Sequence, residues 1–159
     1  MSVSGQCAPE PALEHYLYPG LVCAFAGRCV ITTMLATCVA VCLWDPKAAV
    51  GGANHYLVPH EASDERVEGL GRFGPTAFRE LSTRLEAAGA RRERLRAKVF
   101  GGTKGRGAAD RGLGERNAEL AFRLLGERRI PVEACDTGGD RSRKLLFHTD
   151  DGRALVSYF

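Results

Sequence analysis

The sequence predicts a single-domain α+β protein, and three observations support this prediction. Its length of 159 residues suits one domain. Hydrophobic residues make up 45% of the chain and charged residues 26%, which is typical of soluble globular proteins and not of disordered or fibrous ones. Short β-rich stretches come first, and two amphipathic helical stretches then alternate with further strands. This order favours an α+β fold over a regular doubly wound sheet.

The first part of the chain is expected to form a tail followed by four strands. Residues 1–14 carry turn-forming residues and little hydrophobic periodicity, which predicts a flexible N-terminal tail before one domain over residues 15–159. The predicted strands are 21–24, 30–34, 39–44 and 53–58. Because the 39–44 stretch, VAVCLW, is apolar on both faces, it should lie in the middle of a covered sheet.

The second part is expected to contain both helices. Apolar residues at three- and four-residue spacing predict an amphipathic helix over 75–88, with Pro75 in its first turn and Gly89 beyond its end. The same periodicity, in which Asn117 takes part, predicts a helix over 113–128. Further strands are expected at 95–100, 132–136, 144–147 and 154–158, the last two joined as a hairpin. The expected total is seven or eight strands and two helices.

Charge and hydropathy exclude several classes of protein. A net charge of +3 is too small to require a nucleic-acid partner. The longest weakly polar run, residues 29–44, is shorter than the roughly 20 apolar residues of a membrane helix, so no membrane insertion is expected. The N-terminus lacks a basic start followed by an apolar stretch, which predicts a cytoplasmic protein. The six cysteines are accordingly expected to be thiols.

One cysteine and one histidine stand out as a chemical pair. If residues 45–48 form a tight turn, antiparallel pairing of the flanking strands puts Cys38 opposite His55. A thiolate is a nucleophile and an imidazole can take its proton, so the pair points to acyl transfer. Two alternatives stay open. The pair could be a core thiol and a hydrogen-bonded histidine, or Cys38, Cys42 and His55 could bind zinc, although a second ligand pair is missing.

Five motifs in order resemble the CheD family of chemoreceptor glutamine deamidases. They are TTMLATCVAVCLWDP (32–46), VGGANHYLVP (50–59), AKVFGG (97–102), LGERN (113–117) and DTGGDRSRKLLF (136–147). The resemblance implies an α+β sandwich of cysteine hydrolase type with no cofactor and no metal. It implies Cys38 as the nucleophile, His55 as the base and Thr32 as the supporting threonine. The neighbouring Thr33 would point to the opposite face of the strand.

The resemblance also implies the partners. The substrates would be selected glutamines in the cytoplasmic helical region of methyl-accepting chemotaxis receptors, which would be converted to glutamates. A CheC-like phosphatase is a second candidate partner. Where the family usually has Gly-Ser before the cysteine, this chain has Ala36-Thr37, and the lost glycine removes easy access to positive φ. This departure motivates an alternative, a catalytically weak module that binds receptors or a CheC-type protein.

The densest basic run, Arg91 to Lys98 with Lys104 and Arg106, could meet nucleic acid or an acidic protein surface. A solvated face is the favoured interpretation, and no nucleic-acid partner is expected.

Overall fold

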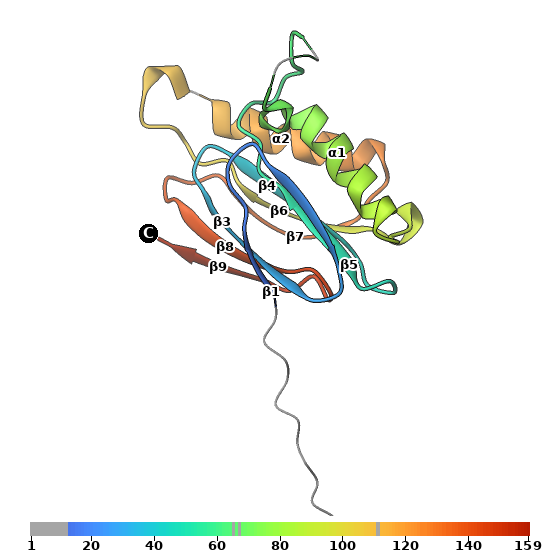
Figure 1. Ribbon diagram of the computed structural model, residues 1–159. Helices are drawn as coiled ribbons and strands as arrows, with labels where there is room; N and C mark the ends of the chain where they lie inside the picture. The colour runs from blue at the N-terminus through green and yellow to red at the C-terminus, as the bar shows by residue number, and fades with distance from the viewer. Residues whose placement is uncertain (1–12, 65, 67, 111) are drawn as a thin grey trace, which may run out of the picture.

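The computed structural model describes residues 13–64, 66, 68–110 and 112–159, which form three layers (Figure 1). The described residues contain nine strands, two α-helices and three short 3-10 helices. The strands are β1 (Leu13–Tyr16), β2 (Val22–Ala26), β3 (Cys29–Leu35), β4 (Val39–Asp45), β5 (Val50–Asn54), β6 (Arg96–Gly101), β7 (Val132–Thr137), β8 (Arg143–His148) and β9 (Ala154–Tyr158). The helices are α1 (Gly74–Ala87), α2 (Leu113–Glu127), η1 (Leu70–Arg72), η2 (Arg92–Arg94) and η3 (Ala108–Asp110).

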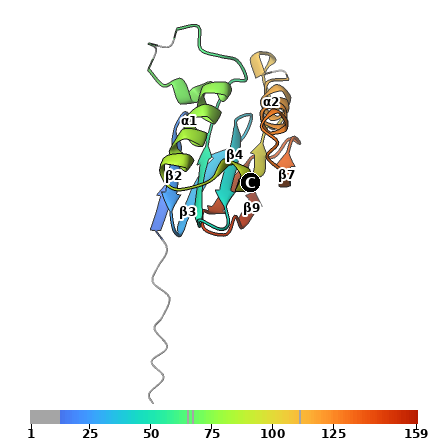
Figure 2. The same cartoon turned by 90° about the vertical axis from the view of Figure 1, so that its right-hand side faces the viewer.

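The central layer is a five-stranded sheet in the order β2-β5-β4-β6-β7. Strand β4 lies in its middle and all seven of its residues are buried, as its apolar sequence predicts. The two α-helices cover one face of this sheet (Figure 2). The core on that side combines Val39, Val41 and Leu43 of β4 with apolar residues of both helices, such as Leu81 and Leu125.

The outer layer is a four-stranded sheet in the order β1-β3-β8-β9, which packs against the other face of the central sheet. The core between the two sheets includes Ile31, Trp44 and Phe147. Strand β1 pairs in parallel with β3 and β7 pairs in parallel with β6, whereas the other pairs are antiparallel. The predicted α+β sandwich with two main helices and a β8–β9 hairpin is therefore confirmed.

The largest departures from the predicted elements lie at β1 and β5. Leu13 and Glu14, assigned above to the tail, belong to β1, while residues 1–12 of the predicted tail lie outside the described residues. Strand β5 runs over Val50–Asn54 and not over 53–58. The predicted strand begins after Gly51 and Gly52, but both lie inside the observed strand because other backbone segments approach closely. A Cβ on Gly51 would lie 2.4 Å from the Thr149 carbonyl oxygen.

Candidate active site

The candidate nucleophile, Cys38, lies in the short segment that links β3 to β4. Its side chain is half-buried and packs against the core between the two sheets. The backbone of the segment is fixed by the end of β6: Gly102 N–H donates to Cys38 O at 2.9 Å, and Thr103 N–H donates to Ala36 O at 2.8 Å. The thiol is thus held at the mouth of the intersheet core, where a substrate can reach it.

The pairing of β4 with β5 brings His55 to the same face as Cys38, but in a different register from the predicted one. Asp45 pairs with Val50, and an isolated bridge joins Val39 to Tyr56 in the same register. Cys38 therefore lies across from residue 57, and the prediction that it faces His55 directly is wrong by two residues. Diagonal neighbours on one face of an antiparallel pair are roughly 7–8 Å apart, so the two side chains remain neighbours.

The register differs because the turn between β4 and β5 is longer than expected. Four residues, 46–49, connect the paired ends. The Asp45 carboxylate accepts hydrogen bonds from the N–H groups of Lys47 at 3.0 Å and Ala48 at 3.1 Å, and Ala49 takes a positive φ of 54°. An Asp-initiated turn of this kind adds two residues to the predicted loop.

His55 is buried and tied to a threonine of the outer sheet. Its Nδ1 lies 2.7 Å from Thr33 Oγ1, and the same hydroxyl donates to the Leu17 carbonyl oxygen at 2.7 Å. A hydroxyl has one proton, and a carbonyl oxygen can only accept. Nδ1 must therefore carry the imidazole proton and donate it to Thr33 Oγ1. Nε2 is left with its lone pair free to accept a proton.

Both groups rest in the neutral state. Burial lowers the pKa of His55 from 6.5 to about 4, so the imidazole is uncharged at neutral pH. Burial also raises the pKa of the Cys38 thiol above its ordinary value. A neutral thiol beside a neutral imidazole favours proton transfer during attack over a preformed thiolate-imidazolium pair.

The geometry favours Thr33 over the predicted Thr32 as the supporting threonine. In β3 the side chains alternate, and Thr33 shares the buried face with Ile31 and Leu35. Thr32 is half-buried on the other face, where its register partners are Tyr16 and Leu146. The motif match selects Thr32, whereas the contact with His55 is made by the adjacent Thr33, because a motif match alone does not show which of two neighbouring threonines faces the core.

The Ala36-Thr37 departure does not require strained backbone. Among the described residues, the non-glycine residues with a positive φ are Ala49 and Arg129, and neither Ala36 nor Thr37 is one of them. Ala36 and Thr37 thus adopt backbone conformations that ordinary residues accept. The structural reason for expecting a distorted nucleophile segment is removed.

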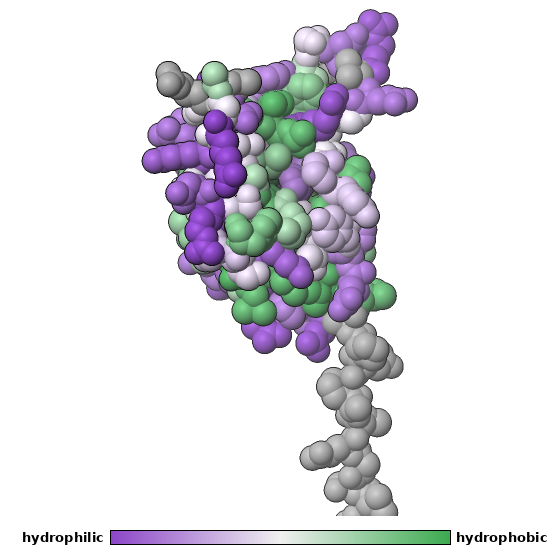
Figure 3. All heavy atoms as spheres, turned by 90° about the vertical axis from the view of Figure 1, so that its left-hand side faces the viewer, coloured by the Kyte–Doolittle hydropathy of each residue, from purple (hydrophilic) through white to green (hydrophobic). Residues whose placement is uncertain are grey.

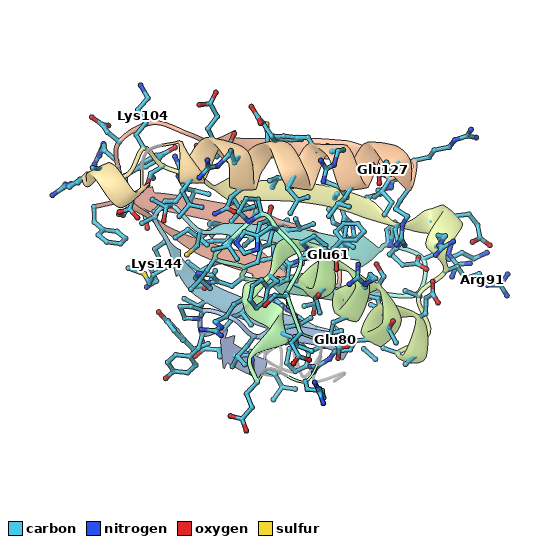
Figure 4. The ribbon with its side chains drawn as sticks, turned by 90° about the horizontal axis from the view of Figure 1, so that it is seen from above. Glu61, Glu80, Arg91, Lys104, Glu127 and Lys144 are labelled. Carbon is cyan, nitrogen blue, oxygen red and sulfur yellow. The ribbon has the colours of Figure 1, made fainter. Side chains whose placement is uncertain are left out.

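The basic run does not form the single patch considered above. Seen from the helical side, Arg91 and Lys104 lie at opposite ends of the molecule (Figure 4). Arg94 pairs with the buried Asp45 at 2.9 Å, and Arg96 pairs with Glu133 at 2.6 Å. Because two of its arginines are neutralised by partners, the run fits a solvated, ion-paired face better than a nucleic-acid surface.

The zinc alternative gains no geometric support. Cys42 is fully buried in β4, and over the part of the chain that the structure describes, His, Cys, Asp and Glu side chains form no group of three that could hold a metal ion. Neither is there, within the same residues, a helix with the length and apolarity to cross a bilayer.

Two polar residues near the site were not assigned a role from the sequence. Asn117 of α2 is fully buried, and its Nδ2 donates to Thr37 O at 3.0 Å and to Leu57 O at 2.9 Å. Arg143 of β8 is also buried and donates to Gly101 O at 2.7 Å. The available signal was a polar amide on the apolar face of a predicted helix, which is unusual unless it is hydrogen-bonded.

The end of the molecule where β4 begins carries an apolar centre. Figure 3 shows this end, with hydrophobic side chains gathered in the middle of the face and hydrophilic ones on either side. Met34, the second-last residue of strand β3, is 37% exposed. An apolar surface beside a nucleophile suits a protein substrate better than a small polar one.

Comparisons with known proteins show which family the chain resembles. The family model for CheD chemotactic sensory transduction matches residues 57–158. A probable chemoreceptor glutamine deamidase CheD 1 from Anaeromyxobacter dehalogenans is 50% identical over 145 residues, covering 90% of this chain and 83% of the relative. A probable chemoreceptor glutamine deamidase CheD from Trichlorobacter lovleyi is 42% identical over 151 residues, covering 92% of this chain and 91% of the relative.

The family match begins two residues after His55, so Cys38 and His55 lie outside it. The alignment with the Anaeromyxobacter relative leaves only a tenth of this chain uncovered, which is less than the stretch that precedes Cys38, so it includes both residues. Among solved structures, a Neisseria meningitidis protein of the DUF152 family superposes with a TM-score of 0.52 at 12% identity, covering 89% of this chain and 76% of that one. This similarity concerns the fold alone.

Proposed function

The chain belongs to the CheD family, and on this basis we propose that it is a chemoreceptor glutamine deamidase. Its substrates would be selected glutamine side chains of methyl-accepting chemotaxis receptors, hydrolysed to glutamates. The observation that carries the proposal is the half-buried thiol of Cys38 on the same face as a buried histidine whose Nδ1–H is fixed by Thr33. Such an arrangement supplies a nucleophile and an oriented base.

The first half of the reaction forms a thioester. Nε2 of His55 takes the thiol proton as Cys38 Sγ attacks the side-chain amide carbon of glutamine. The tetrahedral intermediate carries a negative oxygen, which backbone N–H groups of the segment 36–38 would stabilise. The intermediate collapses as the imidazolium returns its proton to the amide nitrogen, and ammonia leaves.

The second half hydrolyses the thioester. Neutral His55 takes a proton from water, whose oxygen attacks the thioester carbon. The C–S bond then breaks, the thiol recovers its proton from His55, and glutamate is released. The low pKa of His55 suits this role because the imidazole returns to its neutral, basic form after each proton transfer.

The proposed partners follow from the substrate. The receptors would present their cytoplasmic helical region to the apolar face around the nucleophile, which places the reaction in the cytoplasm. A CheC-like phosphatase is proposed as a second partner. Family membership supports the receptor as a partner, and the apolar centre of the face in Figure 3 supports a helical protein substrate.

Mass spectrometry of a receptor cytoplasmic fragment incubated with the protein tests the proposal. We expect site-specific conversion of glutamine to glutamate, lost in Cys38→Ala and in His55→Gln. Cys135→Ala, which removes an exposed cysteine of β7 far along the chain from the site, is the matched control and should retain full activity. An active Cys38→Ala protein would refute the mechanism. Binding of the receptor without conversion by the unmodified protein would favour the binding-module alternative.

A further inference from the structure

Asn117 presents an unusual use of a buried amide. It lies on the face of α2 that packs on the central sheet, with no exposed surface, among apolar neighbours such as Ala121 and Leu125. Its Nδ2 uses both protons, one toward Thr37 O at 3.0 Å and one toward Leu57 O at 2.9 Å. Its Oδ1 is buried without a hydrogen-bond partner in the described structure. The Asn117 side chain thus satisfies both of its N–H donors while its carbonyl oxygen stays buried and unpaired.

The two acceptors belong to the two segments that carry the proposed chemistry. Thr37 immediately precedes Cys38, and Leu57 follows His55 by two residues. The last pairing between these segments is the bridge from Val39 to Tyr56, and beyond it the described residues show no further pairing of one segment with the other. At this point the carboxamide of Asn117 bridges the two segments, because it donates one hydrogen bond to each of them.

The hydrogen bond to Thr37 also fixes the direction of the next N–H group. In a trans peptide the C=O and the following N–H point in opposite directions, and the described residues contain no cis peptide. Holding Thr37 O toward α2 therefore turns the Cys38 N–H away from α2. This N–H lies close to the Cys38 sulfur, where its hydrogen bond partly offsets the rise in thiol pKa caused by burial.

The orientation of the amide follows from its surroundings. If the carboxamide were flipped, Oδ1 would face two carbonyl oxygens and the two N–H donors would lack partners. The structure therefore requires the nitrogen, not just the shape, of the side chain. A carboxylate of the same shape would place negative charge against two acceptors.

We propose that Asn117 is a positioning residue for this reaction, which holds the Thr37-Cys38 peptide so that the Cys38 N–H meets the oxyanion of the tetrahedral intermediate. The inference rests on the proposed deamidase function. Asn117 touches neither substrate nor thiol and acts through the peptide group that it holds. Removing it should weaken stabilisation of the intermediate without removing the nucleophile or its base.

The test compares two thiol reactions in Asn117→Asp and Asn117→Ser. Deamidation of a receptor fragment passes through an oxyanion. Alkylation of Cys38 by iodoacetamide forms the S–C bond as iodide leaves and needs no oxyanion stabilisation. We expect kcat for deamidation to fall about 100-fold, the loss typical of misplaced catalytic geometry, with KM within about twofold and alkylation slowed less than about threefold. Ala121→Gly, which destabilises the same helix without contacting Thr37 or Leu57, should leave the ratio of the two rates unchanged.

A third measurement keeps the inference separate from the proposed function. Amide hydrogen exchange at Cys38, followed by NMR, should accelerate at least about tenfold in Asn117→Ser relative to Ala121→Gly, because the peptide loses its anchor. Equal losses of deamidation and alkylation, or unchanged kcat and exchange, would overturn the positioning role. Failure of the unmodified protein to deamidate the receptor would refute the proposed function, while the exchange experiment would still decide whether Asn117 holds the peptide.

Discussion

Replacement of Thr33 by valine is the most direct test of how the site is oriented. Valine keeps the β-branched shape that suits strand β3 but lacks the hydroxyl. The hydroxyl makes two buried contacts of 2.7 Å, accepting from His55 Nδ1 and donating to the Leu17 carbonyl oxygen. The substitution therefore leaves both partners unpaired and releases the imidazole from the arrangement that keeps its proton on Nδ1.

The size of the effect follows from these two contacts. Leaving a buried donor or acceptor unpaired costs about 1–3 kcal/mol each, so Thr33→Val should lower the free energy of unfolding by about 2–6 kcal/mol. Thr32→Val, on the half-buried opposite face, should change it by less than about 1 kcal/mol. We expect kcat for receptor deamidation to fall about 100-fold in folded Thr33→Val, since imidazole that carries its proton on Nε2 cannot act as the base.

Urea unfolding and mass spectrometric rates measure the two effects separately. Thr33→Ser keeps the hydroxyl and should retain activity within about tenfold, which covers the case in which Thr33→Val fails to fold. The reasoning would be refuted if Thr32→Val and Thr33→Val lost activity equally, or if only Thr32→Val did so. In either case the threonine that faces the core would not be the one that orients His55.

Three further predictions concern stability. Because burial lowers the pKa of His55 from 6.5 to about 4, its contribution of about 3 kcal/mol to the free energy of unfolding is complete above pH 6.5 and is lost as pH falls toward 4. His55→Gln should remove this part of the pH dependence of stability in urea titrations. An unchanged slope of stability against pH would contradict the assignment. Asp45→Asn should lower the free energy of unfolding by about 1–3 kcal/mol, because the buried carboxylate accepts hydrogen bonds from Arg94 and from the Arg91 N–H, and an unchanged free energy of unfolding at neutral pH would contradict this. Gly51→Ala should lower the melting temperature by several degrees, since its Cβ would meet Thr149 O at 2.4 Å, and an unchanged midpoint would show that β5 can shift.

The sequence predicts those elements whose environment is uniform along their length. Strand β4 is buried on both faces, so an apolar run is sufficient to place it in the centre of a sheet. Helices α1 and α2 each bury one face, and their periodicity predicts their bounds to within one residue. Strand β5 was misplaced because its glycines reflect close approach of Thr149 and Cys23, which are far from it in sequence.

In the candidate site too, some residues can be proposed from the sequence, whereas their long-range contacts cannot. Cys38 and His55 could be identified because a nucleophile and a base at the ends of two adjacent strands form a recognisable chemical pair. Asn117 could be placed on the buried face of a helix, but its two acceptors belong to segments 80 and 60 residues away. No local pattern indicates which carbonyls a buried amide will meet.

A shift of two residues and a shift of one residue along a strand have different consequences at this site, and strand geometry explains why. Side chains alternate with a period of two residues along a strand. A register error of two residues, as between Cys38 and His55, leaves both side chains on the same face and changes a direct neighbour into a diagonal one. A shift of one residue, as between Thr32 and Thr33, moves the side chain to the other side of the sheet. The proposed pairing of nucleophile and base therefore does not depend on the turn length, whereas the choice between Thr32 and Thr33 depends on which of them faces the core.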